Sequence, residues 1–119
     1  MKLKVRKKWV RQCDTPCRVE NCKTYTPAPG EVVVWCMRPG VFGNPFKKGR
    51  DGTRREVCDK FDRWFYSSKG ERIQKLVKEI IGSGDVLLCC CKPKQCHCDT
   101  IAAYVNAGYN PVHQPMLFQ

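Results

Sequence analysis

The segment spanning residues 85–105 constrains the fold most, because it has the pattern of a strand, a loop and a helix. Residues 85–90 are mostly apolar or small and follow a Gly-Ser-Gly break, which is typical of a strand with both faces buried. The Lys-Pro-Lys-Gln run at 92–95 ends this strand, and apolar residues recur at helical spacing after Asp99. Such a loop lies at the carboxyl end of its strand and faces the unpaired N–H groups of the helix. The segment therefore predicts a site for an anion.

This loop also carries the candidate reactive groups, Cys91, Cys96 and His97. A cysteine near a helix amino terminus with lysines beside it can have a lowered pKa, which predicts thiolate character for Cys96 and Cys98. His97 is expected to act as a base or to hold an anion. In the alternative interpretation His97 only satisfies backbone carbonyl groups. For Asp99 we expect a helix cap, a role to which aspartate is well suited.

Zinc is one explanation for the cysteines, because five of the ten, together with one of the two histidines, lie between residues 89 and 98. The spacing is unfavourable. On an extended strand the Cβ atoms of Cys89 and Cys91 lie about 6.6 Å apart, whereas two sulfur atoms on one zinc ion approach to under about 4 Å. Only a bend at the end of the strand would bring these two thiols to one ion.

A second group of cysteines precedes this segment. Three thiols in a polar loop have little core to join, so with one further cysteine they are expected either to form a four-sulfur zinc site or to remain free. The predicted ligands are Cys13, Cys17, Cys22 and Cys36. No two cysteines have the C-x-x-C spacing, which argues against a thioredoxin-like oxidoreductase.

The charge balance indicates a polyanionic partner or substrate. The 119 residues include 22 Lys and Arg against 11 Asp and Glu, a formal net charge of +11. A nucleic acid or a phosphorylated small molecule would match this charge, and a basic surface that only aids solubility is the alternative. The chain has no apolar run of membrane-spanning length and no signal-peptide block near its amino terminus. We expect a cytoplasmic protein with reduced thiols and no membrane partner.

The chain is short enough for a single domain, residues 1–119. Residues 31–36 (EVVVWC) give the clearest strand, because three valines and a tryptophan stand between turn residues. Residues 11–30 are polar and contain prolines, which predicts an inserted loop that carries cysteines. The tail, 108–119, is predicted to form a short strand or a strap.

Two amphipathic helices are expected between the strands. Thr53 and Glu56 have the spacing of a capping box, and apolar residues follow at helical intervals. Ser68 and Glu71 repeat that spacing before a second apolar stripe, which ends at Gly82. We assign both stripes to the core.

The order of strands and helices predicts an α/β domain, Rossmann-like, with a small mostly parallel sheet and flanking helices. Right-handed crossovers align the strands, so the loops after residues 36 and 90 are expected to face one crevice at the carboxyl edge of the sheet. Arginines there would hold phosphate or carboxylate, and glycines would admit a close backbone approach. The expected ligand-binding residues are Arg38, Gly43, Asn44, Arg54 and Asp99.

These residues also carry a resemblance to a known family. The motif that begins at Cys89 and ends at Asp99 resembles the C-x-C-x-P-x-x-C-H-G-D block of domain of unknown function 4326, a family of phages, bacteria and some large viruses. Upstream blocks occur in the expected order: Arg38-Pro39, FGNPF at 42–46, Gly52-Thr53-Arg54 with Glu56, and Trp64. The match covers about residues 32–107, with Cys98 in place of the usual Gly and Phe42 in place of the usual Trp. The resemblance implies a fold and a site, and the family has no settled reaction.

Two functions are considered in detail, and a third possibility is a phage protein that blocks a host factor by surface contact. In the first, the protein binds a nucleotide or another phosphorylated ligand between the loops at 38–46 and 89–99, with or without a reaction on it. In the second, it is a non-enzymatic nucleic-acid-binding accessory protein with a structural zinc site. Nucleic-acid contacts are then expected from the basic amino-terminal strand and from the loop before the first helix, at Lys2, Lys4, Arg6, Lys47, Lys48 and Arg50. The motifs of cysteine phosphatases, zinc deaminases and P-loop proteins are absent.

Overall fold

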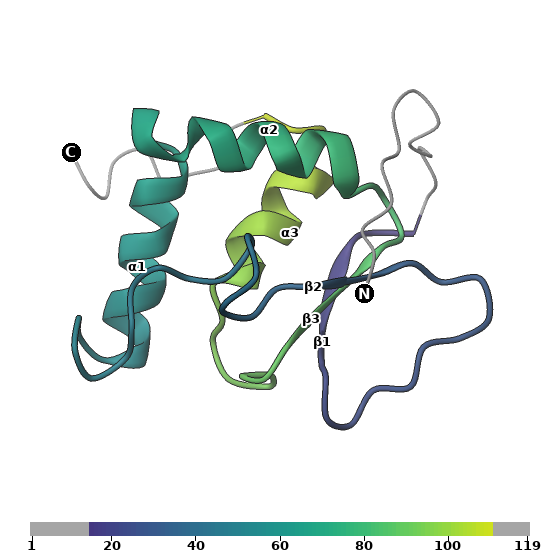
Figure 1. The fold of residues 1–119 in the computed structure, drawn as a ribbon. Helices are drawn as coiled ribbons and strands as arrows, with labels where there is room; N and C mark the ends of the chain where they lie inside the picture. Colours follow the sequence, from purple (N-terminus) through teal and green to yellow (C-terminus); the bar gives the residue numbers. More distant parts are fainter. Residues whose placement is uncertain (1–14, 111–119) are drawn as a thin grey trace.

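The structure is a computed structural model that describes residues 15–110. Its elements along the chain (Figure 1) are β1 (Arg18–Asn21), β2 (Val33–Trp35), α1 (Arg54–Phe65), a 3-10 helix (Ser68–Gly70), α2 (Glu71–Ile80), β3 (Val86–Cys89) and α3 (Cys98–Asn106). Within this described range no helix has the length and apolar character that a membrane span requires.

The sheet has the strand order β1-β3-β2, and β3 pairs in parallel with both neighbours. All four residues of β3, the central strand, are buried. Val19 of β1, Leu87 of β3 and Val34 of β2 lie in one row across the sheet. The predicted α/β class, with a small parallel sheet and flanking helices, is confirmed.

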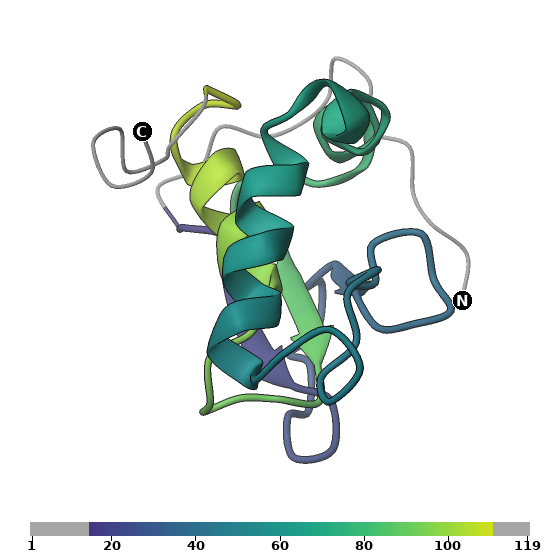
Figure 2. The ribbon, with the colours of Figure 1, turned by 90° about the vertical axis from the view of Figure 1, so that its left-hand side faces the viewer.

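The three helices lie on one side of this sheet. Figure 1 shows α3 between the sheet and α1, with α2 along the top, and Figure 2 shows α1 in front of α3 from the side. Leu87 and Val34 join the core with Phe61 and Phe65 of α1 and Ile101 of α3. The domain is thus built of two layers, and the carboxyl ends of β2 and β3 reach the same edge of the sheet.

The sheet also contains a strand that the sequence pattern did not predict. Residues 11–30 were expected to form an inserted loop, yet β1 lies within them. Only Val19 is apolar among the four residues of β1, so the alternation of a strand is missing. The strand forms because its backbone pairs with β3 and Val19 packs against the core. The predicted amino-terminal strand, and the predicted tail beyond residue 110, lie outside the described residues.

Helix α1 begins with the predicted capping box. The Thr53 side chain accepts a hydrogen bond from the Glu56 N–H at 3.2 Å, and the Glu56 carboxylate accepts one from the Thr53 N–H at 2.8 Å. Two N–H groups at the helix start, which have no partner within the helix, are thereby satisfied.

Replacing Thr53 with alanine is expected to lower the free energy of unfolding by about 1 kcal/mol, because the cap removed is solvent-exposed and neutral. Urea denaturation followed by circular dichroism measures this loss. Thr53→Ser keeps the hydroxyl and should retain most of the stability. An alanine variant as stable as the unmodified protein would show that the box contributes nothing.

The start of α2 differs from the prediction. Gly70 is the N-cap residue, and no side chain caps the helix. Ser68, the predicted cap, is exposed. Instead, the Ser67 hydroxyl accepts a hydrogen bond from the Lys69 N–H and caps the 3-10 helix. The apolar stripe of α2 is buried, as predicted.

Candidate functional site

A pocket of about 130 Å³ lies where the loops after β2 and β3 meet the first half of α1. Its lining comes from the loop after β2 (Met37, Arg38, Asn44, Phe46, Lys48), from α1 (Arg54, Val57, Cys58), and from β3 with its loop (Cys89, Cys90, Cys91, Gln95, Cys96, His97). The two loops therefore face one another, as the parallel order predicts. Among the expected site residues, Gly43 and Asp99 do not line this pocket.

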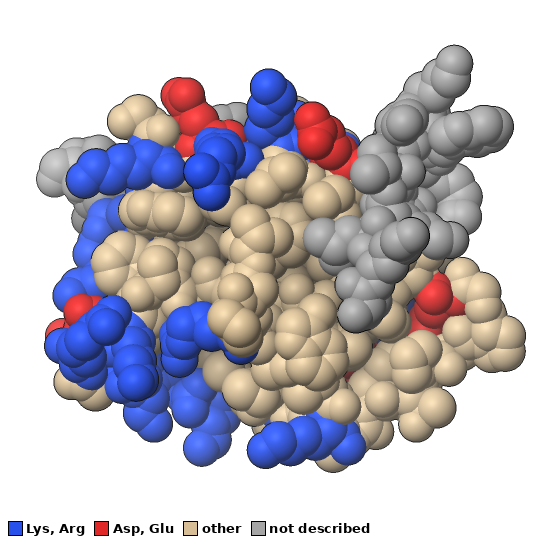
Figure 3. All heavy atoms as spheres, viewed as in Figure 1, with Lys and Arg blue, Asp and Glu red and all other residues tan. Residues whose placement is uncertain are grey.

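The described lining of the pocket is positively charged. Arg38, Lys48 and Arg54 contribute cationic groups, and no carboxylate is among the lining residues. Arg38 and Lys48 are exposed and Arg54 is half-buried. Figure 3 shows Lys and Arg side chains gathered at the lower left and along the bottom of the molecule, where Figure 1 places the loop before α1 and the loop after β3. This end of the domain suits an anion better than a cation.

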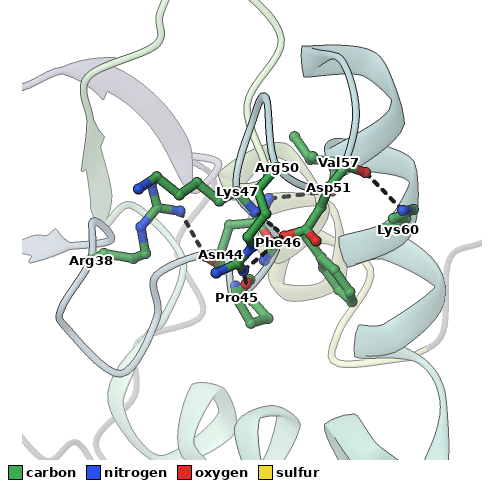
Figure 4. Close-up of polar contacts among 9 residues, drawn as sticks. All are labelled: Arg38, Asn44, Pro45, Phe46, Lys47, Arg50, Asp51, Val57 and Lys60. Atoms are coloured by element: carbon green, nitrogen blue, oxygen red, sulfur yellow. Dashed lines mark hydrogen bonds and ion pairs between the residues drawn. The ribbon is translucent and has the colours of Figure 1, made fainter.

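Asn44 organises the loop after β2 (Figure 4). Its side-chain oxygen accepts a hydrogen bond from the Phe46 N–H at 2.9 Å, and its side-chain N–H donates to the Val57 carbonyl of α1 at 3.3 Å. The Asn44 carbonyl accepts a bond from the Arg38 guanidinium at 2.9 Å. The amide of Asn44 is thus used within the protein, and its role is to hold the loop and to orient Arg38.

Gly43 has a packing role in the same loop. A Cβ atom at this position would lie 2.8 Å from the Arg38 backbone nitrogen and 2.9 Å from the Arg38 Cα. Only glycine lets the two arms of the loop approach so closely. Gly43 was predicted to allow a ligand to approach the backbone, and it instead allows the Arg38 backbone of the same loop to pack against it.

The loop just before α1 is held by Asp51 (Figure 4). Its carboxylate accepts hydrogen bonds from the Lys47 N–H at 2.7 Å and from the Arg50 guanidinium at 2.8 and 3.0 Å. The Asp51 carbonyl accepts one from the Lys60 ammonium at 2.7 Å. Arg50 is therefore partly neutralised, whereas Lys48 lines the pocket.

Three thiols converge at the end of β3. The sulfur atoms of Cys89, Cys91 and Cys96 all lie within 4.8 Å of one another. The strand ends at Cys89 and the chain then turns, which supplies the bend that this spacing requires. Cys96, His97 and Cys98 form a second group of close ligand atoms. The described thiol cluster could therefore hold a metal ion.

Cys89 is the thiolate of this cluster. Hydrogen bonds from the thiols of Cys96 and Cys98 lower the pKa of Cys89 to about 2, and the backbone N–H of Cys91 also donates to its sulfur. The contact with Cys89 raises the pKa of Cys96, and contacts with Cys36, Cys89 and Cys96 raise the pKa of Cys98. The predicted thiolate character of Cys96 and Cys98 is therefore wrong. Both are buried, and their raised pKa values keep them protonated.

His97 links the two loops. Its Nε2 lies 2.8 Å from the Phe42 carbonyl oxygen and its Nδ1 lies 3.8 Å from the Cys96 sulfur. Because a ring nitrogen facing a carbonyl must carry the proton, Nε2–H donates to Phe42 and Nδ1 keeps its lone pair. Burial lowers the pKa of His97, so the ring is neutral at pH 7. Its aromatic ring also packs edge-on against Phe61, with 4.9 Å between ring centroids.

The amino terminus of α3 is not open to an anion. His97 is the N-cap residue and its side chain makes no capping bond. The Asp99 carboxylate accepts a hydrogen bond from the Cys96 N–H at 3.3 Å and pairs with the Lys92 ammonium at 3.3 Å. The Cys98 N–H donates to the Cys96 sulfur at 3.4 Å. Asp99 is therefore not the N-cap residue, contrary to the prediction. The backbone N–H groups of Cys96 and Cys98, which were expected to hold an anion, instead donate hydrogen bonds within the protein.

The four-sulfur zinc site predicted near the amino terminus does not form as a set. Cys17 and Cys22 stand at opposite ends of β1, five residues and so about 16 Å apart along the strand. They cannot bind the same ion. The Cys36 thiol instead contacts Cys98, and Cys13 lies outside the described residues.

Cys58 and Cys89 are among the lining residues that the sequence analysis did not assign to the ligand site. Cys89 was considered there only as a zinc ligand. Burial raises the pKa of Cys58 to about 11, so its thiol remains protonated. Its position was detectable, because Cys58 follows Arg54 by four residues and so shares its helix face.

The family model for a domain of unknown function, DUF4326, matches residues 19–107. The chain belongs to this family. The match includes β1, the pocket loops and α3, and it thus covers all the described elements except the first residue of β1. No curated protein and no solved structure gives a significant match to the chain. Membership of DUF4326 confirms the resemblance seen in the sequence and assigns no activity.

Proposed function

We propose that this DUF4326 protein binds a nucleotide or another phosphorylated ligand in the pocket between the loops after β2 and β3. The observation that supports the proposal is the pocket lining, in which three cationic side chains stand without a carboxylate. Arg38 and Arg54 are suited to phosphate because a guanidinium presents planar paired donors. The position at the carboxyl edge of a parallel sheet is also where α/β proteins bind ligands.

The size of the pocket defines the part of the ligand that it takes. A volume of about 130 Å³ is below the range of about 300–1,000 Å³ that encloses drug-sized ligands. The pocket therefore takes the phosphoryl end of a ligand, and a base or sugar lies outside it over the loops. Side chains, and not the amino terminus of α3, supply the donors in this arrangement. The nine described cysteines are free thiols, which agrees with action in a reducing cytoplasm.

Replacing Arg38 or Arg54 with alanine is expected to weaken ligand binding by about tenfold each, the size of one charge-assisted hydrogen bond. Calorimetric titration with inorganic phosphate and with nucleoside mono-, di- and triphosphates measures the effect. Arg63→Ala is the matched control, because Arg63 lies exposed on α1 and does not line the pocket. Equal affinity in all three variants would refute this site.

A nucleic-acid-binding protein with a structural zinc ion is the second candidate function. The exposed residues Lys47, Lys48 and Arg50 favour it, although Arg50 is paired with Asp51. The residues expected to help at the amino terminus lie outside the described part of the chain. Titration with a single-stranded oligonucleotide at several salt concentrations separates the candidates. Affinity that falls steeply with salt and does not need Arg38 would favour nucleic acid.

A further inference from the structure

We propose that Cys89, Cys91, Cys96 and His97, which all line the pocket, bind one zinc ion at its wall. The site is independent of the phosphate-binding proposal, since it rests on different side chains and has its own test. Three thiolates and one imidazole are an established ligand set for tetrahedral structural zinc.

The three sulfur atoms are close to the spacing that zinc needs. With Zn–S bonds of about 2.3 Å, the sulfurs of a tetrahedral site lie about 3.8 Å apart. Those of Cys89, Cys91 and Cys96 all lie within 4.8 Å of one another. A closure of about 1 Å or less per pair completes the set. Because Cys91 stands in the turn after β3, this closure requires no change within the sheet.

His97 is oriented as the fourth ligand. A histidine that binds metal through one nitrogen almost always donates the other N–H to a carbonyl or carboxylate. Here Nε2–H donates to the Phe42 carbonyl at 2.8 Å, and Nδ1 lies 3.8 Å from the Cys96 sulfur. Nitrogen and sulfur ligands of one zinc ion are separated by about 3.6 Å. Among the described ligand atoms, His97 groups with Cys96 and Cys98, so its ring must turn toward Cys89 and Cys91 to bind the same ion.

The surroundings also suit metal-bound thiolates. Zinc with three thiolates carries one net negative charge, whereas three cationic side chains line the same pocket. The pocket thus keeps a positive balance when the ion is bound. The ion would join the loop after β3 to α3 and, through the Phe42 contact, to the loop after β2.

Metal analysis of the full chain, purified without added zinc and without chelator, tests the site. We expect one equivalent of zinc, with thiols that become reactive only after chelation. Cys91→Ser and His97→Gln should each lower zinc affinity by about 100-fold or more, since even loss of a group that supports a ligand costs 10- to 100-fold. Cys91 is half-buried, so its substitution disturbs the core least. Cys90→Ser is the matched control, because Cys90 lines the same pocket outside the ligand set.

Cobalt substitution provides a second measurement on the same variants. Cobalt in the unmodified protein should show intense thiolate-to-metal charge-transfer bands and a tetrahedral visible spectrum, unchanged by inorganic phosphate because all four positions are filled. A spectrum that phosphate alters would overturn His97 as the fourth ligand. A metal-free protein without cobalt bands, or a Cys91→Ser variant that binds zinc like Cys90→Ser, would overturn the site. Loss of zinc in Cys98→Ser with full retention in His97→Gln would also overturn this ligand set.

Discussion

Replacing Phe61 with alanine is expected to lower the free energy of unfolding by about 3–5 kcal/mol. Phe61 is 1% exposed and lies on the buried face of α1. Its ring packs against Trp64 and Phe65, each at 5.7 Å between centroids, and against His97 at 4.9 Å. The truncation leaves a cavity at the point where α1 supports the site loop. A large loss follows because three aromatic neighbours cannot all collapse into the space.

The measurement for Phe61 is chemical denaturation of matched variants. Asp59→Ala is the control, because Asp59 is exposed on the same helix. Phe61→Leu fills most of the space and should lose less stability than Phe61→Ala. A second readout is the NMR signal of the His97 ring protons, which should shift when the neighbouring aromatic ring is removed. A Phe61→Ala variant no less stable than Asp59→Ala would show that α1 does not support the loop in this way.

The helices and the central strand could be predicted from the sequence because their signals are local. The capping box of Thr53 and Glu56 and the stripe that contains Phe61 need only neighbours within a few residues. Strand β3 is recognisable because burial on both faces produces a continuous apolar run. Strand β1 has no such signal. It exists through pairing with β3, which is distant in the sequence, and through Val19 alone.

The candidate site was predictable in its place and less so in the role of each residue. Parallel strand order brings Arg38 and the cysteine loop to one edge, which topology alone dictates. Whether Cys89 and Cys91 approach one another depends on the turn after β3, and no spacing rule describes that turn. Asn44 belongs to a family motif, yet its amide bonds to the loop and to α1. A motif therefore marks residues needed at a site without separating those that touch a ligand from those that shape it.

At the corner between α1 and α2, the structure differs most clearly from what the sequence pattern predicts. The sequence spacing predicts a cap by Ser68, whereas the structure places Gly70 at the N-cap. A Cβ atom at Gly70 would lie 2.3 Å from the Phe65 carbonyl oxygen and 2.5 Å from the Trp64 carbonyl oxygen. Both obstacles are backbone atoms of the last turn of α1, so no side chain can move to make room. The absence of a side chain at residue 70, and not the hydroxyl at residue 68, sets how the second helix follows the first.

Gly70→Ala is therefore expected to lower the free energy of unfolding by about 3 kcal/mol, at the upper end of typical overpacking losses. Ser68→Ala, two residues away, should change stability by less than about 0.5 kcal/mol, because Ser68 is exposed and caps nothing. Urea denaturation of both variants shows whether the missing side chain at Gly70 or a cap by Ser68 fixes this corner. A stable Gly70→Ala variant together with a destabilised Ser68→Ala variant would restore the capping box as the cause of the corner. The opposite result would show that close backbone contact fixes the angle at which α2 covers the core.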